Sequence, residues 1–374
     1  MYKRPNYETA RQEAGFGWYV GSSQDALREV TGIPIREFNL EPQACIEAYR
    51  KGRRLLREMF GEDVGLPGVS TPAISYGHVN GLGSVLIFPE GGEVGHTHIY
   101  RSLDEGIRAL RQPVDFARAG MASFYIEFRE KMKAAFPGEP VGFSYGLEGP
   151  ITTAYEMRGD GIFTDVLDSP GLTAKFLGLV VDSILQFHRF HCTVVGVAAV
   201  DPKGSGMCDD ISSMIPPRMW PQVVLPFWEQ YYTGMTTGTR SAHVEDLRPA
   251  QLGYLEEIGL RYYDPSISAR IDPGIIFGGC RVPFGWRLGS FHYRNMDGQD
   301  IRDFVFKAAA DGASSVFTYV AHGMCNESTL EKVRAFIRAA KEAERLLQKG
   351  ASRVELAQLV SGRGRDKFWK TWLR

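Results

Sequence analysis

Short apolar runs alternate with longer amphipathic stretches along most of the chain. The runs are rich in β-branched and aromatic residues and indicate strands, whereas the longer stretches repeat their apolar residues at helical spacing. Parallel strands need long crossover connections, so this alternation predicts a parallel sheet. We expect strands at residues 85–89, 141–145, 194–200, 238–242, 260–263, 282–284 and 315–320, and helices at 41–60, 102–120, 121–136, 172–190, 217–231, 247–258, 299–310 and 328–348.

The alternation predicts an α/β fold, a (β/α)8 TIM barrel in which eight such units close into a domain of about 250 residues or more. An open doubly wound sheet is the competing arrangement. A dinucleotide-binding version of that sheet has no support, because no Gly-x-Gly-x-x-Gly follows the first strand. We expect an N-terminal helical extension over residues 1–64 and the TIM-barrel catalytic domain over residues 65–374.

The composition is that of an ordinary globular protein. The 374 residues are 44% hydrophobic and 23% charged, with a net charge of −1 at pH 7. This charge gives no electrostatic reason to expect nucleic acid or an anionic membrane as a partner. No apolar run is long enough to span a bilayer and no secretory signal follows Met1, so we expect a cytoplasmic location. The 5 cysteines are scattered and form no Cys-x-x-Cys pair, which argues against a disulfide framework.

Side chains that bind metals or transfer protons follow several of the expected strands. In a barrel the loops after the strands converge on one mouth, where the active site lies. His243 and Glu245 are two apart, so on a strand they face the same way, and Cys325 follows the last strand. Imidazole, carboxylate and thiolate are the protein ligands of zinc, and three of them with one open position make a catalytic site. We therefore expect these three residues to hold zinc, which would act as a Lewis acid.

Other candidate residues occupy the same expected mouth. His322 and Asp209 are the candidates for catalytic proton transfer or substrate orientation. Plainer interpretations also exist, because Asp209 suits a helix N-cap and His243 suits a hydrogen-bonded core histidine. The expected substrate-binding residues, three of which suit an apolar pocket, are Tyr145, Glu148, Asp210, Trp286, Phe291, His292 and Tyr293.

These motifs resemble the uroporphyrinogen decarboxylase superfamily, and most closely its corrinoid-dependent methyltransferase branch. The likeness runs over residues 82–345. Residues 83–90 look like the family's first strand with its following proline, and residues 149–152 (Gly-Pro-Ile-Thr) look like its Gly-Pro-x-Thr turn. Residues 209–210 resemble the Asp-Asp loop of the methyltransferase branch, and His243 resembles the first residue of its His-x-Cys metal motif. The resemblance implies the same barrel of eight β/α units.

The resemblance implies a zinc-dependent methyltransferase that moves a methyl group between a small donor and a corrinoid protein. The donor would be a methoxylated aromatic, in an O-demethylation, or a methylamine, and the corrinoid (cobalamin) would be carried by the partner protein. The expected partners are therefore this small methylated substrate and the corrinoid protein, without nucleic acid or membrane, and a homodimer stays open. Two departures stand out. Glu245 replaces the motif cysteine and makes the site more oxygen-rich, and Met324 aligns with the cysteine of a Pro-Gly-Cys motif, one position before Cys325.

A metal-free decarboxylase, which would be a carboxy-lyase, is the alternative function. Residues 321–324 (Ala-His-Gly-Met) match the decarboxylase pattern Gly-His-Gly-Ile, and the segment from Arg11 resembles its arginine-rich segment without the second arginine. The first strand also lacks the aspartate that the decarboxylase uses to hold the pyrrole nitrogens. In this alternative Arg11, Arg281 and Arg287 would bind substrate carboxylates. A third hypothesis is a non-catalytic barrel that only binds a corrinoid or another tetrapyrrole.

Overall fold

The computed structural model describes residues 2–89 and 92–370 of the chain. It divides into two compact units, each assembled from separate stretches of sequence. The first unit comprises Met1–Lys3, Ile33–Tyr49 and Gly68–Ala242, and the second comprises Arg4–Gly32, Arg50–Pro67 and His243–Arg374.

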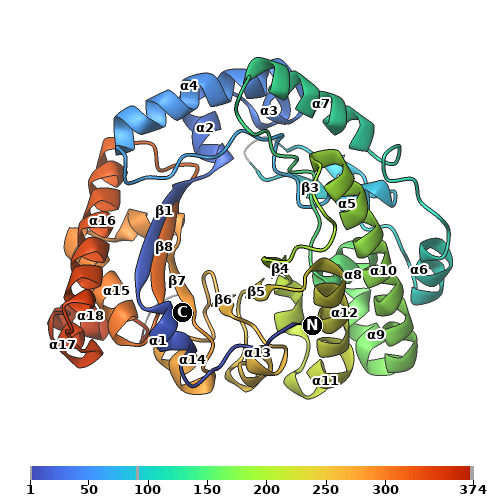
Figure 1. The fold of residues 1–374 in the computed structure, drawn as a ribbon. Coiled ribbons are helices and arrows are strands. Elements are labelled where there is room, and N and C mark those ends of the chain that lie inside the picture. Colours follow the sequence, from blue (N-terminus) through green and yellow to red (C-terminus); the bar gives the residue numbers. More distant parts are fainter. Residues whose placement is uncertain (1, 90–91, 371–374) are drawn as a thin grey trace. The chain divides into compact units, whose positions relative to one another are not determined.

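A parallel three-stranded sheet of order β1-β8-β7 is the framework of the second unit (Figure 1). Strands β1 (Gly17–Ser22) and β7 (Gly285–Leu288) both run parallel to β8 (Ser315–Val320). The predicted strand at 315–320 is confirmed. Strand β1 was not expected from the sequence, because Gly17 and Gly21 leave only three apolar residues between them.

Successive residues of these strands point to opposite faces of the sheet. Val316, Thr318 and Val320 share one face of β8 and are buried. This is the face expected to lie under α15 (Gly298–Ala310), which packs on β8, and α16 (Glu327–Gln348), which packs on β1. Both helices confirm predicted segments almost to the residue. The opposite face carries the polar and aromatic side chains described with the site below.

A fourth strand, β6 (Tyr262–Asp264), joins this sheet through a parallel bridge between Tyr263 and Phe284. The predicted strands at 260–263 and 282–284 therefore correspond to β6 and to the residues that lead into β7. The other helices of the second unit are α1 (Ala10–Ala14), α2 (Gln24–Thr31), α13 (Gly253–Glu257), α14 (Pro273–Gly279), α17 (Arg353–Gln358) and α18 (Gly362–Lys367), with 3-10 turns at Pro249–Gln251 and Ser290–Asn295.

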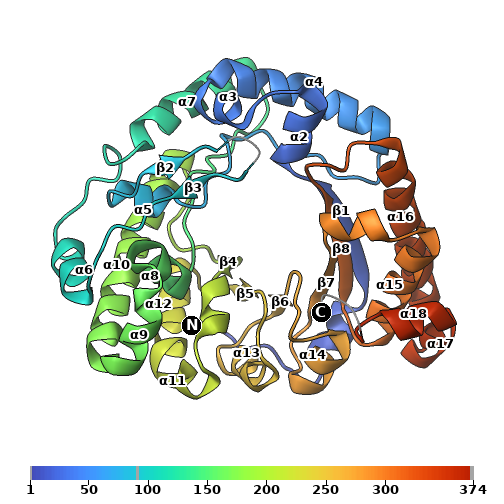
Figure 2. The ribbon, with the colours of Figure 1, turned by 180° about the vertical axis from the view of Figure 1, so that it is seen from behind.

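The longest helix, α10 (Pro170–Val195), is the packing centre of the first unit (Figure 2). Its residues Phe176, Val180, Ile184 and Phe187 are fully buried and recur at helical spacing, so they form one continuous apolar stripe. The helices that pack on α10 are α6 (Leu103–Leu110), α8 (Pro150–Arg158), α9 (Gly161–Asp168), α11 (Trp220–Val223) and α12 (Leu225–Met235).

The strands of the first unit are short. β2 (Leu86–Ile87) pairs antiparallel with β3 (Gly95–His96), and β4 (Gly204–Cys208) lies beside β5 (Thr239–His243), whose last residue belongs to the second unit. The predicted strand at 141–145 appears as two parallel bridges, Ser70 to Gly142 and Ile74 to Tyr145. Glu90, the last residue of the segment that resembles the family's first strand, lies outside the described residues. The remaining helices are α3 (Ile35–Leu40), α4 (Pro42–Phe60, which continues into the second unit), α5 (Gly77–Gly81) and α7 (Ala122–Ala135), with 3-10 turns at Asp210–Met214 and Pro217–Met219.

The predicted strand at 194–200 is wrong. Helix α10 continues through Val195 and ends at Gly196, which takes the left-handed conformation (φ 80°, ψ 36°) and donates its N–H to the carbonyl of Cys192. A glycine in this conformation is the usual C-terminal stop of a helix. Val197 and Val200, 60% and 44% exposed, lie in the loop beyond it. The strand that precedes Asp209 is β4, so the sequence placed a strand before this residue but chose the wrong segment.

Three predicted helices are shorter or more broken than expected. α6 ends at Leu110, before Pro113, although the prediction extended this helix to residue 120. The segment 217–231 divides into a 3-10 turn, α11 and α12, with Pro221 and Pro226 in the first turns of the last two. Proline has no backbone N–H and favours the start of a helix, so each proline begins a new element instead of continuing the old one. The segment 247–258 likewise divides into a 3-10 turn and α13.

Candidate functional site

His243, at the end of β5, is held by a carboxylate from the next strand. Its Nδ1 donates a hydrogen bond to Oδ2 of Asp264 over 2.8 Å, and its Nε2 lies 3.8 Å from Oε1 of Glu245. The side chains of His243 and Asp264 are 27% and 25% exposed, so the pair is partly open to solvent. Because Nδ1 is engaged by the carboxylate, Nε2 is the nitrogen that can bind a metal or accept a proton.

Ser266, in the loop that follows β6, fixes Asp264 in turn. Its Oδ1 accepts the backbone N–H of Ser266 over 2.7 Å, and the hydroxyl of Ser266 accepts a hydrogen bond from Nη1 of Arg287 over 3.2 Å. Ser266 is fully buried and has a positive φ of 47°. Left-handed backbone is uncommon at a serine, and such residues gather at functional sites. A continuous chain of hydrogen bonds therefore links Arg287 to His243.

Aromatic rings cover the same face of the sheet as Arg287. Tyr19, Phe317 and Arg287 lie in one row of neighbouring strands, and Tyr319 follows two residues along β8. The guanidinium of Arg287 lies 5.5 Å from the ring centre of Tyr319, which packs edge to face on Tyr19. Gly21 leaves room for this arrangement, because a Cβ there would lie 2.6 Å from the hydroxyl of Tyr19. Tyr19 is 48% exposed, so this face offers an accessible aromatic surface.

Cys325 contacts α2 and is not brought to His243 and Glu245. The carboxylate of Glu29 accepts the N–H groups of Gly323 and Cys325, and the thiol of Cys325 points toward the carbonyl of Ala26. Burial, and then the negative charge of Glu29, raises the pKa of Cys325 to about 12. The thiol is therefore protonated at neutral pH, which is unfavourable for a metal ligand.

Among residues 2–89 and 92–370, no three His, Cys, Asp or Glu side chains form a group that could hold a metal ion. The zinc site expected from His243, Glu245 and Cys325 is thus not assembled here as a trio. His322 is exposed in the turn after β8, and Met324 is buried with its sulfur against the N–H of Ala321.

The expected substrate residues of the second unit occupy different environments. Trp286 is buried on the face opposite Arg287, where its ring packs against Trp369. Tyr293 is also buried, and its hydroxyl donates to Thr318. Phe291 is 49% exposed and lies against His292, and burial together with the charge of Arg287 lowers the pKa of His292 to about 4. His292 is therefore the one of the four whose pKa the charge of Arg287 lowers, with burial as the larger cause.

Asp209 is fully buried at the end of β4 in the first unit. Its Oδ1 accepts the backbone N–H of Thr152 over 2.7 Å, and its Oδ2 accepts the indole N–H of Trp228 over 2.5 Å. These bonds take the place of the helix cap that was the plainer interpretation. Burial raises the pKa of Asp209 to about 7, even though the two hydrogen bonds act in the opposite direction. A carboxyl with such a pKa can exchange a proton near neutral pH.

The Gly-Pro-Ile-Thr turn of α8 packs directly against this aspartate. Gly149 donates its N–H to the carbonyl of Cys208 over 2.6 Å, and Ile211 donates its N–H to the hydroxyl of Thr152 over 3.1 Å. A Cβ at Gly149 would lie 2.5 Å from the Cβ of Asp209. The two motifs that carried the sequence resemblance are therefore in contact with each other.

More carboxyl groups surround Asp209. Glu156, on α8, is 4% exposed, and burial followed by the charges of Glu148 and Asp209 raises its pKa well above the ordinary value. Tyr76 belongs to the same neighbourhood, because burial, Glu156 and Glu148 all raise its pKa. Asp210 is half-buried and begins the 3-10 turn after Asp209. Asp209 and Glu156 therefore keep their protons to a higher pH than ordinary carboxyl groups do.

Tyr145 is a core residue of the first unit and lies outside this cluster of carboxyls. Its hydroxyl donates to the side chain of Asn80 over 2.5 Å, and its ring stacks on Tyr125 at 5.3 Å. Tyr145 is fully buried, so we assign it a packing role in the core and not a role in substrate binding.

Asp264, Glu156 and Tyr319 are among the residues of these two groups that the sequence did not select. Asp264 ends a strand, as His243 does, so the rule that selected His243 also applies to it. Glu156 had no comparable signal, because it lies within a helix and its burial depends on tertiary packing.

No protein-family model matches the chain, and no curated protein matches it. The structure is similar to that of a methyltransferase from Methanosarcina mazei, with a TM-score of 0.62 and 15% sequence identity over 89% of this chain and 96% of that chain. A protein from Listeria monocytogenes, provisionally described as a vitamin-B12 independent methionine synthase, gives a TM-score of 0.45 and 12% identity over 88% and 96% of the two chains. The first likeness shows a shared fold and confirms the predicted α/β class. The closed barrel of eight strands stays a prediction.

None of the helices in the described part of the chain combines the length and apolar character needed to cross a bilayer.

Proposed function

We propose that this chain is a methyltransferase of the uroporphyrinogen decarboxylase superfamily that transfers a methyl group from a small donor to a corrinoid protein. The fold shared with the Methanosarcina methyltransferase supports the proposal. The sequence resemblance at residues 149–152, 209–210 and His243 supports it independently.

The hydrogen bond between His243 and Asp264 is the observation that carries the proposal. A histidine that binds a metal almost always donates its other ring N–H to a carboxylate or a carbonyl, which fixes its orientation. Here Nδ1 is bound to Asp264, and Nε2 is 3.8 Å from Glu245. His243 and Glu245 would be the donors that hold a zinc ion here.

The residues fit zinc in part. His243 and Glu245 supply two suitable donors, whereas Cys325 has a raised pKa and contacts α2. We therefore assign His243 and Glu245 as the protein ligands that this arrangement favours. When bound, zinc would polarise the heteroatom that carries the methyl group and make it a better leaving group.

The surrounding side chains suit the proposed donors. Arg287 and Ser266 hold Asp264, and through it they orient His243. The rings of Tyr19 and Tyr319 offer an apolar surface for a methoxylated aromatic ring, or a π-face for a methylammonium group. In the reaction the methyl group leaves its heteroatom, the bonding electrons stay on that heteroatom, and the demethylated product takes up a proton. The two electrons of the new carbon–cobalt bond come from reduced cobalt(I).

The proposal is tested with free cob(I)alamin as the methyl acceptor and a panel of methoxybenzoates and methylamines as donors. Formation of methylcobalamin is followed by absorbance, and metal content is measured by elemental analysis on the same samples. We expect at least one donor to be demethylated, and His243→Ala to lose zinc and to reduce the rate by about 100-fold or more. A wild-type protein that binds zinc but methylates neither free cobalamin nor a corrinoid protein with any donor would overturn the methyltransferase assignment.

The decarboxylase alternative has less support. Three arginines were expected to bind substrate carboxylates. Arg11 donates to backbone carbonyls of α14 and its flank, Arg281 pairs with Glu8 and Glu256, and Arg287 donates to Ser266 in the site described above. Release of carbon dioxide from a tetrapyrrole carboxylate by metal-free protein would favour this alternative.

A further inference from the structure

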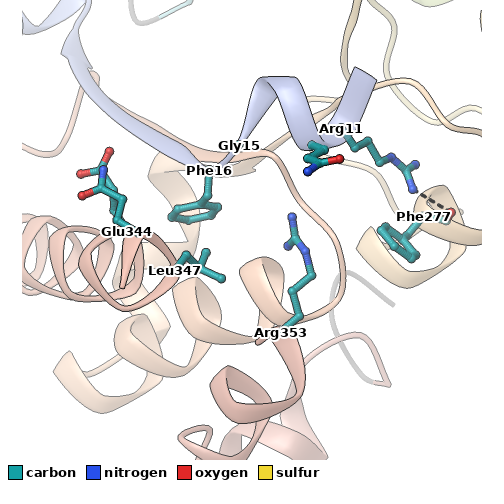
Figure 3. A pocket seen from close by; sticks show the side chains of 9 residues that line it. Arg11, Gly15, Phe16, Phe277, Glu344, Leu347 and Arg353 are labelled. Carbon is teal, nitrogen blue, oxygen red and sulfur yellow. Dashed lines mark hydrogen bonds between the residues drawn. The ribbon is translucent and has the colours of Figure 1, made fainter. Parts of the chain in front are cut away.

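A cavity of about 460 Å³ opens in the second unit. It is lined where α1 turns into β1, at the end of α16 and at the start of α17 (Figure 3). Phe16 directly precedes β1, so the cavity lies at the amino ends of the parallel strands, whereas Asp264 is the carboxyl-terminal residue of β6. The volume falls in the range of small-molecule sites. The cavity is therefore separate from the site proposed above.

Arg353 carries the main polar function of this cavity. Its Nη1 donates to the carbonyl groups of Ala309 and Ala313 at the end of α15. Its Nε and Nη2 have no partner among the described residues, and neither atom is sealed from solvent. These two nitrogens form one edge of the guanidinium, and an edge with two parallel N–H groups matches the two oxygens of a carboxylate.

Arg11 places a second positive charge beside the first. It donates to the carbonyls of Phe277 and Cys280, over 3.0 and 2.5 Å, and its guanidinium lies 4.4 Å from the ring centre of Phe277. Neither Arg11 nor Arg353 forms an ion pair with a carboxylate in the described part of the chain. Burial lowers the pKa of both arginines, and the charge of Arg11 lowers that of Arg353 further. An anion bound between them would relieve this repulsion.

The other walls of the cavity combine the apolar side chains of Phe16, Phe277 and Leu347 with the amides of Gln12 and Gln348 and the carboxylate of Glu344. Phe16 and Leu347 line it next to Arg353 in Figure 3, and Phe277 lies on the far side. Glu344 is the acidic residue of the lining, and its carboxylate accepts the indole N–H of Trp18 over 3.1 Å. It is drawn at the opposite end from the two arginines. The lining thus has a cationic end and an apolar middle.

We propose that this cavity binds a small organic carboxylate, whose carboxylate group accepts hydrogen bonds from Nε and Nη2 of Arg353 and whose apolar body packs on Phe16 and Leu347. The site does not depend on the proposed methyl transfer. An organic carboxylate would contact both the positive charge and the apolar side chains of the cavity. A bare inorganic anion would contact the charge alone.

The test compares phenylbutyrate with phenylbutanol, which has the same apolar body without the charge. Isothermal titration calorimetry with the purified full-length chain should give a Kd of roughly 1 mM or lower for the acid and binding at least about tenfold weaker for the alcohol. Thermal unfolding should show a higher Tm with the acid, because a ligand of the native state stabilises it.

Two variants locate the site. Leu347→Glu adds a second carboxylate to the cavity, beside that of Glu344, and leaves the bonds from Arg353 to the end of α15 in place. It should weaken binding of the acid by about tenfold or more. Arg353→Lys keeps the charge but loses the two-pronged edge, so it should weaken binding by a smaller factor. Arg338→Met, an exposed arginine on α16 away from the lining, is the matched control and should bind like the wild type.

Equal binding of the acid and the alcohol would overturn the proposal without reference to any variant. So would wild-type affinity in a folded Leu347→Glu protein, since the anion would then bind elsewhere. No detectable heat and no Tm change at saturating solubility of phenylbutyrate would likewise overturn it for this class of carboxylate.

Discussion

The Nδ1 atom of His243 and the Oδ2 atom of Asp264 are 2.8 Å apart, and these two residues end successive strands of the chain. A backbone bond of 3.0 Å from the N–H of Val244 to the carbonyl of Asp264 runs beside this contact. The strand ends are therefore held together by backbone and side chain at once. In the neutral imidazole this geometry puts the proton on Nδ1 and the lone pair on Nε2, next to Glu245.

Removing the carboxylate should release this histidine. We expect Asp264→Ala to weaken zinc binding by about 10–100-fold, because the orientation of His243 is then no longer fixed. Competition with a chelating dye measures the affinity, and nitrogen chemical shifts of His243 report its tautomer without any metal. Asp366→Ala, which removes an exposed carboxylate paired with Lys370, is the control. An unchanged tautomer and unchanged affinity in Asp264→Ala would contradict the assigned role.

The contact between Gly149 and Asp209 should make Gly149 intolerant of a side chain. An alanine Cβ would lie 2.5 Å from the Cβ of Asp209 and 2.8 Å from the carbonyl of Cys208, which is backbone and cannot move freely. We expect Gly149→Ala to reduce the free energy of unfolding by about 1–3 kcal/mol in urea denaturation. Gly171→Ala is the matched control, because nothing lies within 4 Å of its Cβ and alanine favours the helix there. Equal stability of the two variants would show that the turn and the aspartate separate easily.

Much of the secondary structure followed from local pattern. The strand at 315–320 and the helices around it were predicted correctly because their apolar residues repeat at the period of each element. The prediction of a strand at 194–200 was wrong because it gave more weight to the β-branched residues of this run than to Gly196, which ends helix α10. Strand β1 was not predicted because it forms by pairing with β8, which lies near the other end of the chain, and no local pattern records that pairing.

The site was predictable where one rule covered it. Spacing of two predicted that His243 and Glu245 face the same way, and Nε2 of His243 lies 3.8 Å from Oε1 of Glu245, although β5 ends at His243 and Glu245 lies in the turn that follows. Cys325 was assigned by the same strand-end rule, but its turn folds onto Glu29 of α2. That contact joins residues nearly three hundred positions apart, and no local pattern records it. The burial that raises the pKa of Asp209 has the same tertiary origin.

The thiol of Cys325 should react slowly with alkylating agents. Its pKa is raised to about 12 by burial and by Glu29, so little thiolate exists at neutral pH. In a time course with iodoacetamide, read by mass spectrometry, we expect the exposed Cys208 to be labelled before Cys325. Glu29→Gln removes the negative charge and should speed labelling of Cys325 severalfold, whereas Glu37→Gln, on the exposed side of α3, should not.

Added zinc makes the same experiment informative about the metal. If zinc protected Cys325 in the wild type but not in His243→Ala, the thiol would be a ligand after all, against the arrangement seen here. Equal labelling rates for Cys325 and Cys208 without metal would contradict the raised pKa.

The buried carboxyl of Asp209 should make stability depend on pH. Its pKa is about 7 in the folded chain, above the ordinary value of 3.8, so the folded state holds this proton more tightly than the unfolded state. The corresponding stabilisation is complete below pH 3.8 and is lost as the pH rises through about 7. The loss amounts to at most about 4 kcal/mol. Urea denaturation at several pH values measures it as a falling free energy of unfolding.

Asp209→Asn should flatten that fall between about pH 4 and pH 7, because the amide does not titrate. The variant also loses the acceptor for Trp228, so its stability is lower at every pH, and the slope is the quantity to compare. Asp168→Asn, at an exposed position on α9, should keep the wild-type slope. An Asp209→Asn protein whose slope equals that of the wild type would mean that Asp209 is ionised throughout this range, and its role as a proton donor near neutral pH would have to be abandoned.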